Sequence, residues 1–144
     1  MSEFAAFLKT NKPKKENVLF PACADYKDEK GNVLNWELRH LNPLIIGTIR
    51  SECTTITGKG TGAKVDGELF GRKMAAAAVV KPDLRNAELV DSYMGDYAPE
   101  DRTPDNLICL MIDNEKEYQA FLKKVFEMNG IINDTENKVE TIKN

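Results

Sequence analysis

The hydrophobic residues recur with two different periods, and each period predicts a different kind of element. Leu34, Trp36 and Leu38 alternate with polar residues, which is the pattern of a strand with one buried face. An apolar run at 18–20 predicts a partner strand, and the residues between the two runs are rich in turn-forming types. We therefore predict a β-hairpin over residues 17–39, with Trp36 as its largest anchor.

Helical spacing of the apolar residues dominates the rest of the chain. A capping residue followed by proline marks two helix starts, at 42–43 and 103–104, and Gly130 supplies a helix stop. An Ala-rich helix is expected to run over 69–81, where Pro82 ends it. In full, the predicted helices lie at 2–8, 42–53, 69–81, 86–93, 104–112 and 113–130.

These elements and the length of 144 residues fit one domain with a modest core. The predicted fold class is α+β: a mainly helical single domain with an N-terminal β-hairpin packed on a helical body. The hairpin should lie against helices because an isolated hairpin is marginally stable in water. The expected parts are a terminal helix at 1–10, a linker at 11–16, the hairpin at 17–39, a helical body at 42–130 within a domain of 1–132, and a flexible polar tail at 133–144.

The expected terminal helix carries Phe4, Phe7 and Leu8 on one face. The lysine-rich linker that follows is expected to be solvated and mobile. The apolar face docks either on the body of the protein or on another molecule, and the sequence leaves both alternatives open. In the second case, these three residues bind a partner.

The last predicted helix shows the clearest periodicity of the chain. Tyr118, Phe121, Leu122 and Val125 recur at helical spacing and form one apolar stripe. Such a stripe predicts core packing in the first place and a binding groove as the alternative.

The net charge of −3 conceals a strongly acidic stretch. Residues 83–117 hold ten acidic and three basic side chains, a net charge of −7. A surface of this sign repels the phosphate backbone, so nucleic acid is not an expected partner. It suits a basic or apolar protein partner, or it faces only water. Glu88 and Asp91 are the members of this face that we predict to contact a partner.

No stretch of the sequence carries a catalytic signature. The glycine-rich 58–64 lacks the second glycine and the Ser or Thr of a P-loop, and no βαβ pattern surrounds it. A small phosphate-binding enzyme is an alternative that rests on this loop alone. The wider 54–67 is interpreted as a flexible loop or a poorly anchored hairpin. We therefore expect no enzyme activity, no catalytic or metal-binding residue, and no cofactor.

The remaining polar candidates have structural interpretations. His40, the single histidine, is expected to be structural or solvated. The cysteines lie far apart without a C-x-x-C pair, which predicts buried free thiols. The acids within 96–105 do not follow the calcium-loop spacing and are interpreted as a solvated loop or a partner-facing patch.

No apolar run could span a bilayer, and the N-terminal residues lack a signal peptide, so we expect a cytoplasmic protein without a membrane partner.

Three motifs follow one another in a definite order along the chain. They are W-E-L-R at 36–39, V-x-P-D-L-x-N-A-E-L-x-D-S-Y at 80–93 and E-Y-x-x-F-L-x-K-V-x-E-x-N-G at 117–130. With these motifs the chain resembles the XkdN-like tail assembly chaperones of phages and of phage-derived tail particles in Gram-positive bacteria. The resemblance covers nearly the whole chain.

The resemblance implies a non-enzymatic role in the host cytoplasm. Such a chaperone holds the tape measure protein in solution, helps to bring tail tube proteins to it, and is absent from the finished particle. The alternative is a structural tail component that stays in the particle. Further expected partners are other copies of the chain in a homo-oligomer and a longer form of the chain. That form would arise by ribosomal frameshifting, because Ile142-Lys143-Asn144 can be encoded by a slippery run of adenines.

Overall fold

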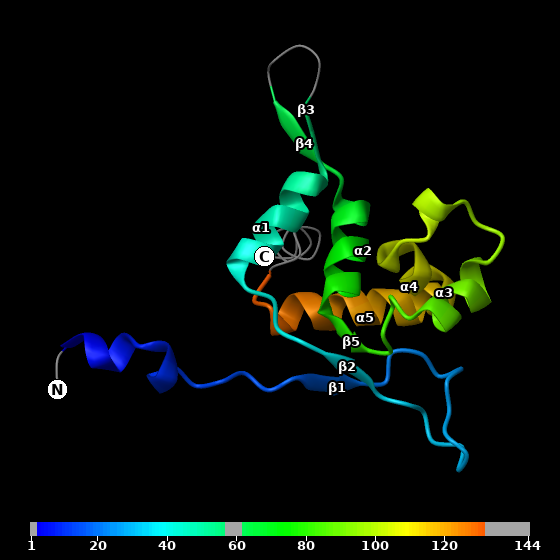
Figure 1. The fold of residues 1–144 in the computed structure, drawn as a ribbon, viewed down its shortest axis with the longest axis horizontal. Coiled ribbons are helices and arrows are strands. Elements are labelled where there is room, and N and C mark those ends of the chain that lie inside the picture. The colour runs from blue at the N-terminus through cyan, green and yellow to red at the C-terminus, as the bar shows by residue number, and fades with distance from the viewer. Residues whose placement is uncertain (1–2, 57–61, 132–144) are drawn as a thin grey trace, which may run out of the picture.

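The computed structural model describes residues 3–56 and 62–131. A three-stranded antiparallel sheet packs below a group of helices in the view of Figure 1, and a two-stranded hairpin projects above them. The strands are β1 (Val18–Phe20), β2 (Trp36–Leu38), β3 (Thr54–Ile56), β4 (Ala63–Val65) and β5 (Val79–Lys81). The α-helices are α1 (Pro43–Glu52), α2 (Gly67–Ala78), α3 (Ala87–Met94), α4 (Pro104–Met111) and α5 (Glu115–Met128), and the short 3-10 helices are η1 (Glu3–Phe7), η2 (Lys9–Asn11) and η3 (Pro99–Asp101). The predicted α+β class is confirmed.

The three-stranded sheet has the order β1-β2-β5 and contains the predicted hairpin. Phe20 lies opposite Trp36 in the register of β1 with β2, and Leu38 lies opposite Val79 in the register of β2 with β5. Between β1 and β2, Gly31 adopts a φ of 84°, a left-handed conformation that glycine enters without steric cost. The turn residues of the sequence therefore mark a real chain reversal.

Strand β5 corrects the predicted end of the Ala-rich helix at position 81. Helix α2 ends at Ala78, and Val79–Lys81 is extended. The β-branched valines fit a strand better than a helix, and β2 offers them backbone partners. The backbone N–H of Arg39 donates to the Ala78 carbonyl at 2.8 Å, at the point where helix becomes strand. The predicted helix end was wrong because the pairing of β5 with the distant strand β2 cannot be read from the spacing of apolar residues along the helix.

Side-chain caps fix the first turns of the helices. At Asn42 and Thr103, the side-chain oxygen accepts a hydrogen bond from the backbone N–H three residues later, at 2.9 and 3.4 Å. Both predicted starts are thus confirmed. The last helix begins at Glu115, two residues later than predicted, because Asn114 is its cap. Gly130 follows that helix with a φ of 69°, as its role as a stop requires.

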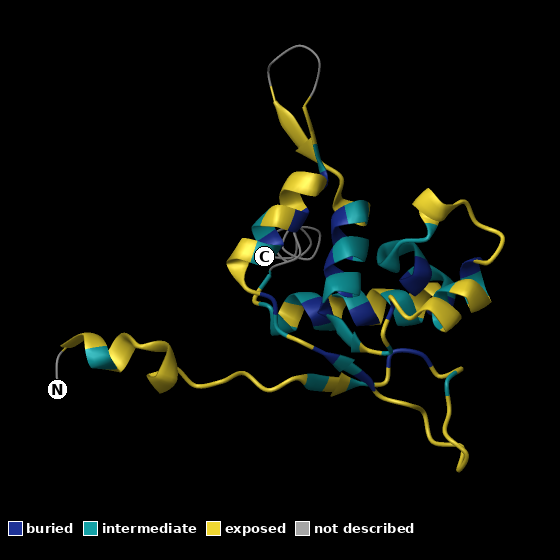
Figure 2. Cartoon of the chain, viewed as in Figure 1, coloured by how far each residue is buried: buried dark blue, intermediate teal, exposed yellow. Residues whose placement is uncertain are grey.

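Helix α2 lies at the centre of the hydrophobic core. Its Met74, Ala75 and Ala78 are fully buried, and the helix packs against α4, α5 and α1. Figure 2 shows the buried segments concentrated where these helices face each other. Phe121 of α5 lies edge-on to Trp36 of β2, with ring centroids 5.9 Å apart. The sheet and the helices therefore share one core, as the predicted packing of the hairpin on the helical body requires.

Strands β3 and β4 form the hairpin that was one of two alternatives for 54–67. Thr54 lies opposite Val65, and Ile56 lies opposite Ala63. Every residue of β4 is exposed, so the hairpin is anchored only at its base. Residues 57–61, which hold most of the glycine-rich stretch, lie outside the described residues. The same is true of the expected polar tail at 133–144.

The packing of β2 gives a direct stability test. Leu38 is fully buried, whereas Leu19 on the neighbouring strand is 62% exposed. We expect Leu38→Ala to lower the free energy of unfolding by about 2–5 kcal/mol, because it leaves a cavity in the core. The matched change Leu19→Ala should stay within about 0.5 kcal/mol of the parent. Urea unfolding followed by Trp36 fluorescence measures both, and equal losses would contradict the assigned burial.

Candidate functional site

Residues 3–16, here called the N-terminal arm, extend away from the body of the molecule (Figure 1). Phe4 is 77% exposed, Phe7 is 85% exposed and Leu8 is 56% exposed. The expected terminal helix is a pair of 3-10 turns, η1 and η2, with no buried residue. The Asn11 side-chain amide donates to the Ala5 carbonyl within the arm. The apolar face predicted as a partner-binding site is therefore turned to solvent and not docked on the body.

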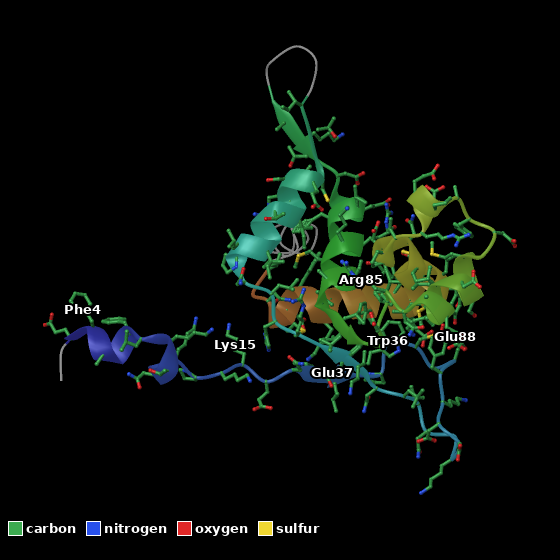
Figure 3. All side chains as sticks on the ribbon, in the orientation of Figure 1. Phe4, Lys15, Trp36, Glu37, Arg85 and Glu88 are labelled. Carbon is green, nitrogen blue, oxygen red and sulfur yellow. The ribbon has the colours of Figure 1, made fainter. Side chains whose placement is uncertain are left out.

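The linker part of the arm explains why the arm does not pack on the body of the molecule. Lysines at 12, 14 and 15 repel each other, Pro13 disfavours helix, and residues 13–17 have no regular structure. The arm joins the sheet at Asn17, whose side-chain amide donates to Glu37 Oε2 at 3.0 Å. Figure 3 shows Lys15 midway along this linker and Phe4 far out on the arm. The arm is thus tethered at one end.

Glu88 and Asp91, the predicted partner contacts of the acidic stretch, lie on α3, at the other side of the molecule. Glu88 and Asp91 are exposed and line a groove of about 750 Å³ between α3 and the start of α4. Arg102 also lines this groove, and its guanidinium donates to the carbonyls of Tyr97 and Gly95 at 3.0 and 2.8 Å. The other lining residues are Leu84, Arg85, Ala87, Val90 and Pro104. This α3 groove is mixed in charge, because two of the three basic residues in the acidic stretch gather there.

The structure does not bring the two predicted partner-binding groups together. Phe4 and Glu88 lie at opposite ends of the molecule in Figure 3, with the sheet and Trp36 between them. One compact ligand cannot contact both on a single copy. An extended partner, or two copies of the chain, would be needed to engage both surfaces.

The predicted stripe on α5 divides between two surfaces. Phe121 and Val125 are fully buried in the core, whereas Tyr118 and Leu122 line a groove of about 850 Å³ bordered by α1, α2 and α5. Phe126, which was not assigned to the stripe, lines the same groove. Its spacing of four residues from Leu122 was the signal that could have revealed a second apolar face. We call this surface the α5 groove.

The α5 groove combines an aromatic floor with buried polar atoms. Phe70 lies edge-on to Phe126 with centroids 6.1 Å apart, and the Arg50 guanidinium lies 5.4 Å from the centre of the Phe70 ring. Arg72 Nε and the Tyr118 hydroxyl are buried without a hydrogen-bond partner among the described residues. Burial raises the pKa of Tyr118, so its hydroxyl stays protonated at neutral pH. Both groups can donate to an acceptor placed in the groove.

The other candidate residues have structural roles. His40 Nδ1 lies 3.1 Å from the last backbone carbonyl of α5, which fits the structural interpretation. Cys23 and Cys53 are buried free thiols as predicted, whereas Cys109 is partly exposed. Burial raises the pKa of Cys23, and its sulfur lies 3.6 Å from Glu117 Oε1. A reactive cysteine needs a lowered pKa, so this environment does not favour nucleophilic chemistry.

Residues 3–56 and 62–131 contain no group of three or more His, Cys, Asp or Glu side chains placed to hold a metal ion. Within the same ranges, every helix is too short or too polar to cross a bilayer. The candidate features for recognition on the described surface include the α3 groove, the α5 groove and the exposed arm.

The arrangement of the elements matches a protein whose structure has been solved. The crystal structure of the protein YqbN superposes with a TM-score of 0.74 at 21% sequence identity, covering 92% of this chain and 99% of that one. A likeness at this identity establishes the fold and nothing further. The fold thus belongs to a known class of small α+β proteins.

Sequence comparison then identifies the family. The model of the phage XkdN-like tail assembly chaperone proteins matches residues 4–143, and the chain belongs to this family. Two similar proteins of Bacillus subtilis strain 168 are the phage-like element PBSX protein XkdN and the uncharacterized protein YqbN. Each is 26% identical over 132 residues, which is 90% of this chain and 85% of the relative. The resemblance seen in the three motifs is confirmed.

Limited proteolysis tests whether the arm stands clear of the body. Trypsin should cut first after Lys14 or Lys15, because the arm has no buried side chain to protect its backbone. Cleavage after Lys73, which lies inside α2, should follow only after the body unfolds. Mass spectrometry of a time course separates the products. First cuts within α2, or an intact arm at late times, would contradict the undocked arrangement.

Proposed function

We propose that this protein is a non-enzymatic phage tail assembly chaperone that binds the tape measure protein and promotes assembly of the tail tube. It acts in the cytoplasm of the bacterial host and is absent from the mature particle. Membership of the tail assembly chaperone family supports the general role. The tape measure protein and the tail tube protein are the partners that fit this role.

The exposed arm is the observation that carries the proposal. Three large apolar side chains, Phe4, Phe7 and Leu8, lie in solvent on a segment with no contact to the core. Exposed apolar groups of this kind are unfavourable in water and gain free energy when a partner covers them. An aromatic arm on a charged tether suits reversible capture of the apolar face of a helical client.

The acidic face is the second part of the proposed client site. Glu88 and Asp91 would contact basic positions of the client, beside the apolar Leu84 and Val90 of the same groove. Since the arm and the α3 groove are far apart, a long client can engage both.

Self-association and a longer frameshift form of the chain are further proposed partners. A slippery run of adenines with an overlapping downstream frame in the coding DNA would support the longer form.

A structural tail component retained in the particle is the alternative function. Quantitative mass spectrometry of purified tails separates the two. A chaperone that leaves before maturation should be absent or far below the amount of the tube protein. Stoichiometric retention would overturn the chaperone proposal.

The role of the arm can be tested with Phe4→Asp combined with Phe7→Asp. We expect this double variant to lose binding of the co-expressed tape measure protein in a pull-down, because two charges replace its apolar contacts. Its free energy of unfolding should stay within about 0.5 kcal/mol of the parent, since both side chains are exposed. Equal loss of binding and stability would place these residues in the core instead.

A matched control keeps the added charge and the exposure the same. Leu44 and Ile56 are both 80% exposed and lie on α1 and β3, away from the arm. Leu44→Asp with Ile56→Asp should retain binding of the tape measure protein. If this control loses binding as strongly as the arm variant, added charge and not the arm is responsible.

A further inference from the structure

The N-terminal arm combines apolar side chains with positive charge. Its three large apolar residues, Phe4, Phe7 and Leu8, are exposed. Exposed lysines follow them at 9, 12, 14 and 15. Residues 3–16 hold four basic and two acidic side chains, a net charge of +2. A surface that binds the arm must therefore be apolar and lie next to negative charge.

The α3 groove is a surface of this kind. Four of its eight lining residues are apolar, namely Leu84, Ala87, Val90 and Pro104. The segment that forms the groove, residues 83–105, holds seven acidic and two basic side chains, a net charge of −5. Six of these acidic side chains are exposed. The arm and the α3 groove are thus complementary in charge, and each has an apolar part to cover.

The arm is folded locally before it meets any partner. The backbone N–H of Asn11 donates to the Leu8 carbonyl at 2.9 Å, and that of Lys12 donates to the Lys9 carbonyl at 3.1 Å. The Asn11 side chain also donates to the Ala5 carbonyl. A segment that is ordered in advance loses less conformational entropy when it docks. The apolar side chains of the arm can therefore be presented to a groove at low cost.

The arm points away from the α3 groove of its own copy. Figure 1 shows it leaving the sheet in line with β1, on the side opposite α3. Figure 3 places Phe4 and Glu88 at opposite ends of the molecule. Only residues 12–17 join η2 to β1, and six residues span roughly 20 Å when extended. Docking within one copy would need this short linker to reverse, whereas a second copy can bring its groove to the arm directly.

We propose that the N-terminal arm of one copy docks in the α3 groove of a second copy. The aromatic side chains of the arm cover the apolar lining of the groove, and its lysines lie near Glu88 and Asp91. Arg85, which is exposed in the groove, stacks on one of the aromatic rings. The contact is heterologous, because the arm and the groove are different surfaces and each copy supplies one of each. The inference rests on the self-association named in the proposed function, and it does not depend on the client.

Sedimentation equilibrium of the full-length chain over a concentration series tests this contact. The parent protein should self-associate. Phe4→Asp with Phe7→Asp, the arm variant, removes the apolar contacts of the arm. Glu88→Lys with Asp91→Lys, the groove variant, reverses the charge beside the groove. Each should weaken self-association by about ten-fold or more, because a few central contacts carry most of the affinity of an interface. Circular dichroism checks that both variants are folded.

A mixture of the two variants gives the decisive measurement. The arm variant keeps an intact groove, and the groove variant keeps an intact arm. The mixture should therefore form a one-to-one complex with an affinity close to that of the parent, although neither variant associates by itself. A symmetric contact between two identical surfaces would not give this result.

Two control variants carry the same charge changes at other exposed positions. Leu44→Asp with Ile56→Asp adds two negative charges away from the arm. Glu29→Lys with Glu127→Lys reverses two negative charges outside the α3 groove. Both controls should self-associate as the parent does.

Several results would overturn the proposal. They are a parent protein that stays monomeric at about 1 mM, controls that lose self-association as strongly as the arm and groove variants, and a mixture that does not associate. Loss of self-association in the arm variant alone would place the arm in a different groove and would also overturn it. These measurements contain no client, so the chaperone proposal is decided separately, by the pull-down of the tape measure protein.

Discussion

The close packing of helix α2 against α4 and α5 is the constraint on which the rest of the structure depends. Because Ala75 and Ala78 have small side chains, the neighbouring helices approach closely and bury Met74 between them. The helix then continues without a loop into β5. Arg39 holds this junction through its backbone N–H and its side-chain Nε, which donate at 2.8 Å to the carbonyls of Ala78 and Ala77. A single continuous segment therefore ties the sheet to the helical body.

The helix starts were predictable because their causes are local. Asn42 and Thr103 lie within a few residues of the amides that they cap, so the sequence contains both partners. Strand β5 was not predictable in this way. An alanine run followed by Val79–Lys81 and a proline has the same pattern whether the last residues complete a helical turn or extend. Only the neighbouring edge of β2, far earlier in the chain, decides between the two.

The sequence shows which candidate site residues are apolar or acidic. Their exposure and their neighbours depend on the whole fold. An apolar face at Phe4 and Phe7 has the same pattern whether the arm docks or stands clear. On α5, Phe121 and Leu122 are adjacent in sequence, yet one faces the core and the other lines a groove. Phe121 packs against Phe20 and Trp36 of the sheet, whereas Leu122 lies over Gly71 of α2. The acidic composition around Glu88 likewise gave no indication that arginines from two separate segments would meet beside it.

The way in which the arm leaves the body also has a mechanical consequence. The arm continues into β1, the outer strand of the sheet, and in Figure 1 it runs nearly in line with that strand. Tension on the arm would therefore act along β1 and stretch its hydrogen bonds to β2 together, in shear, and not open them one after another. Although the pairing spans only three residue pairs, it resists as a unit. Through β5, that resistance is anchored in α2, at the centre of the molecule.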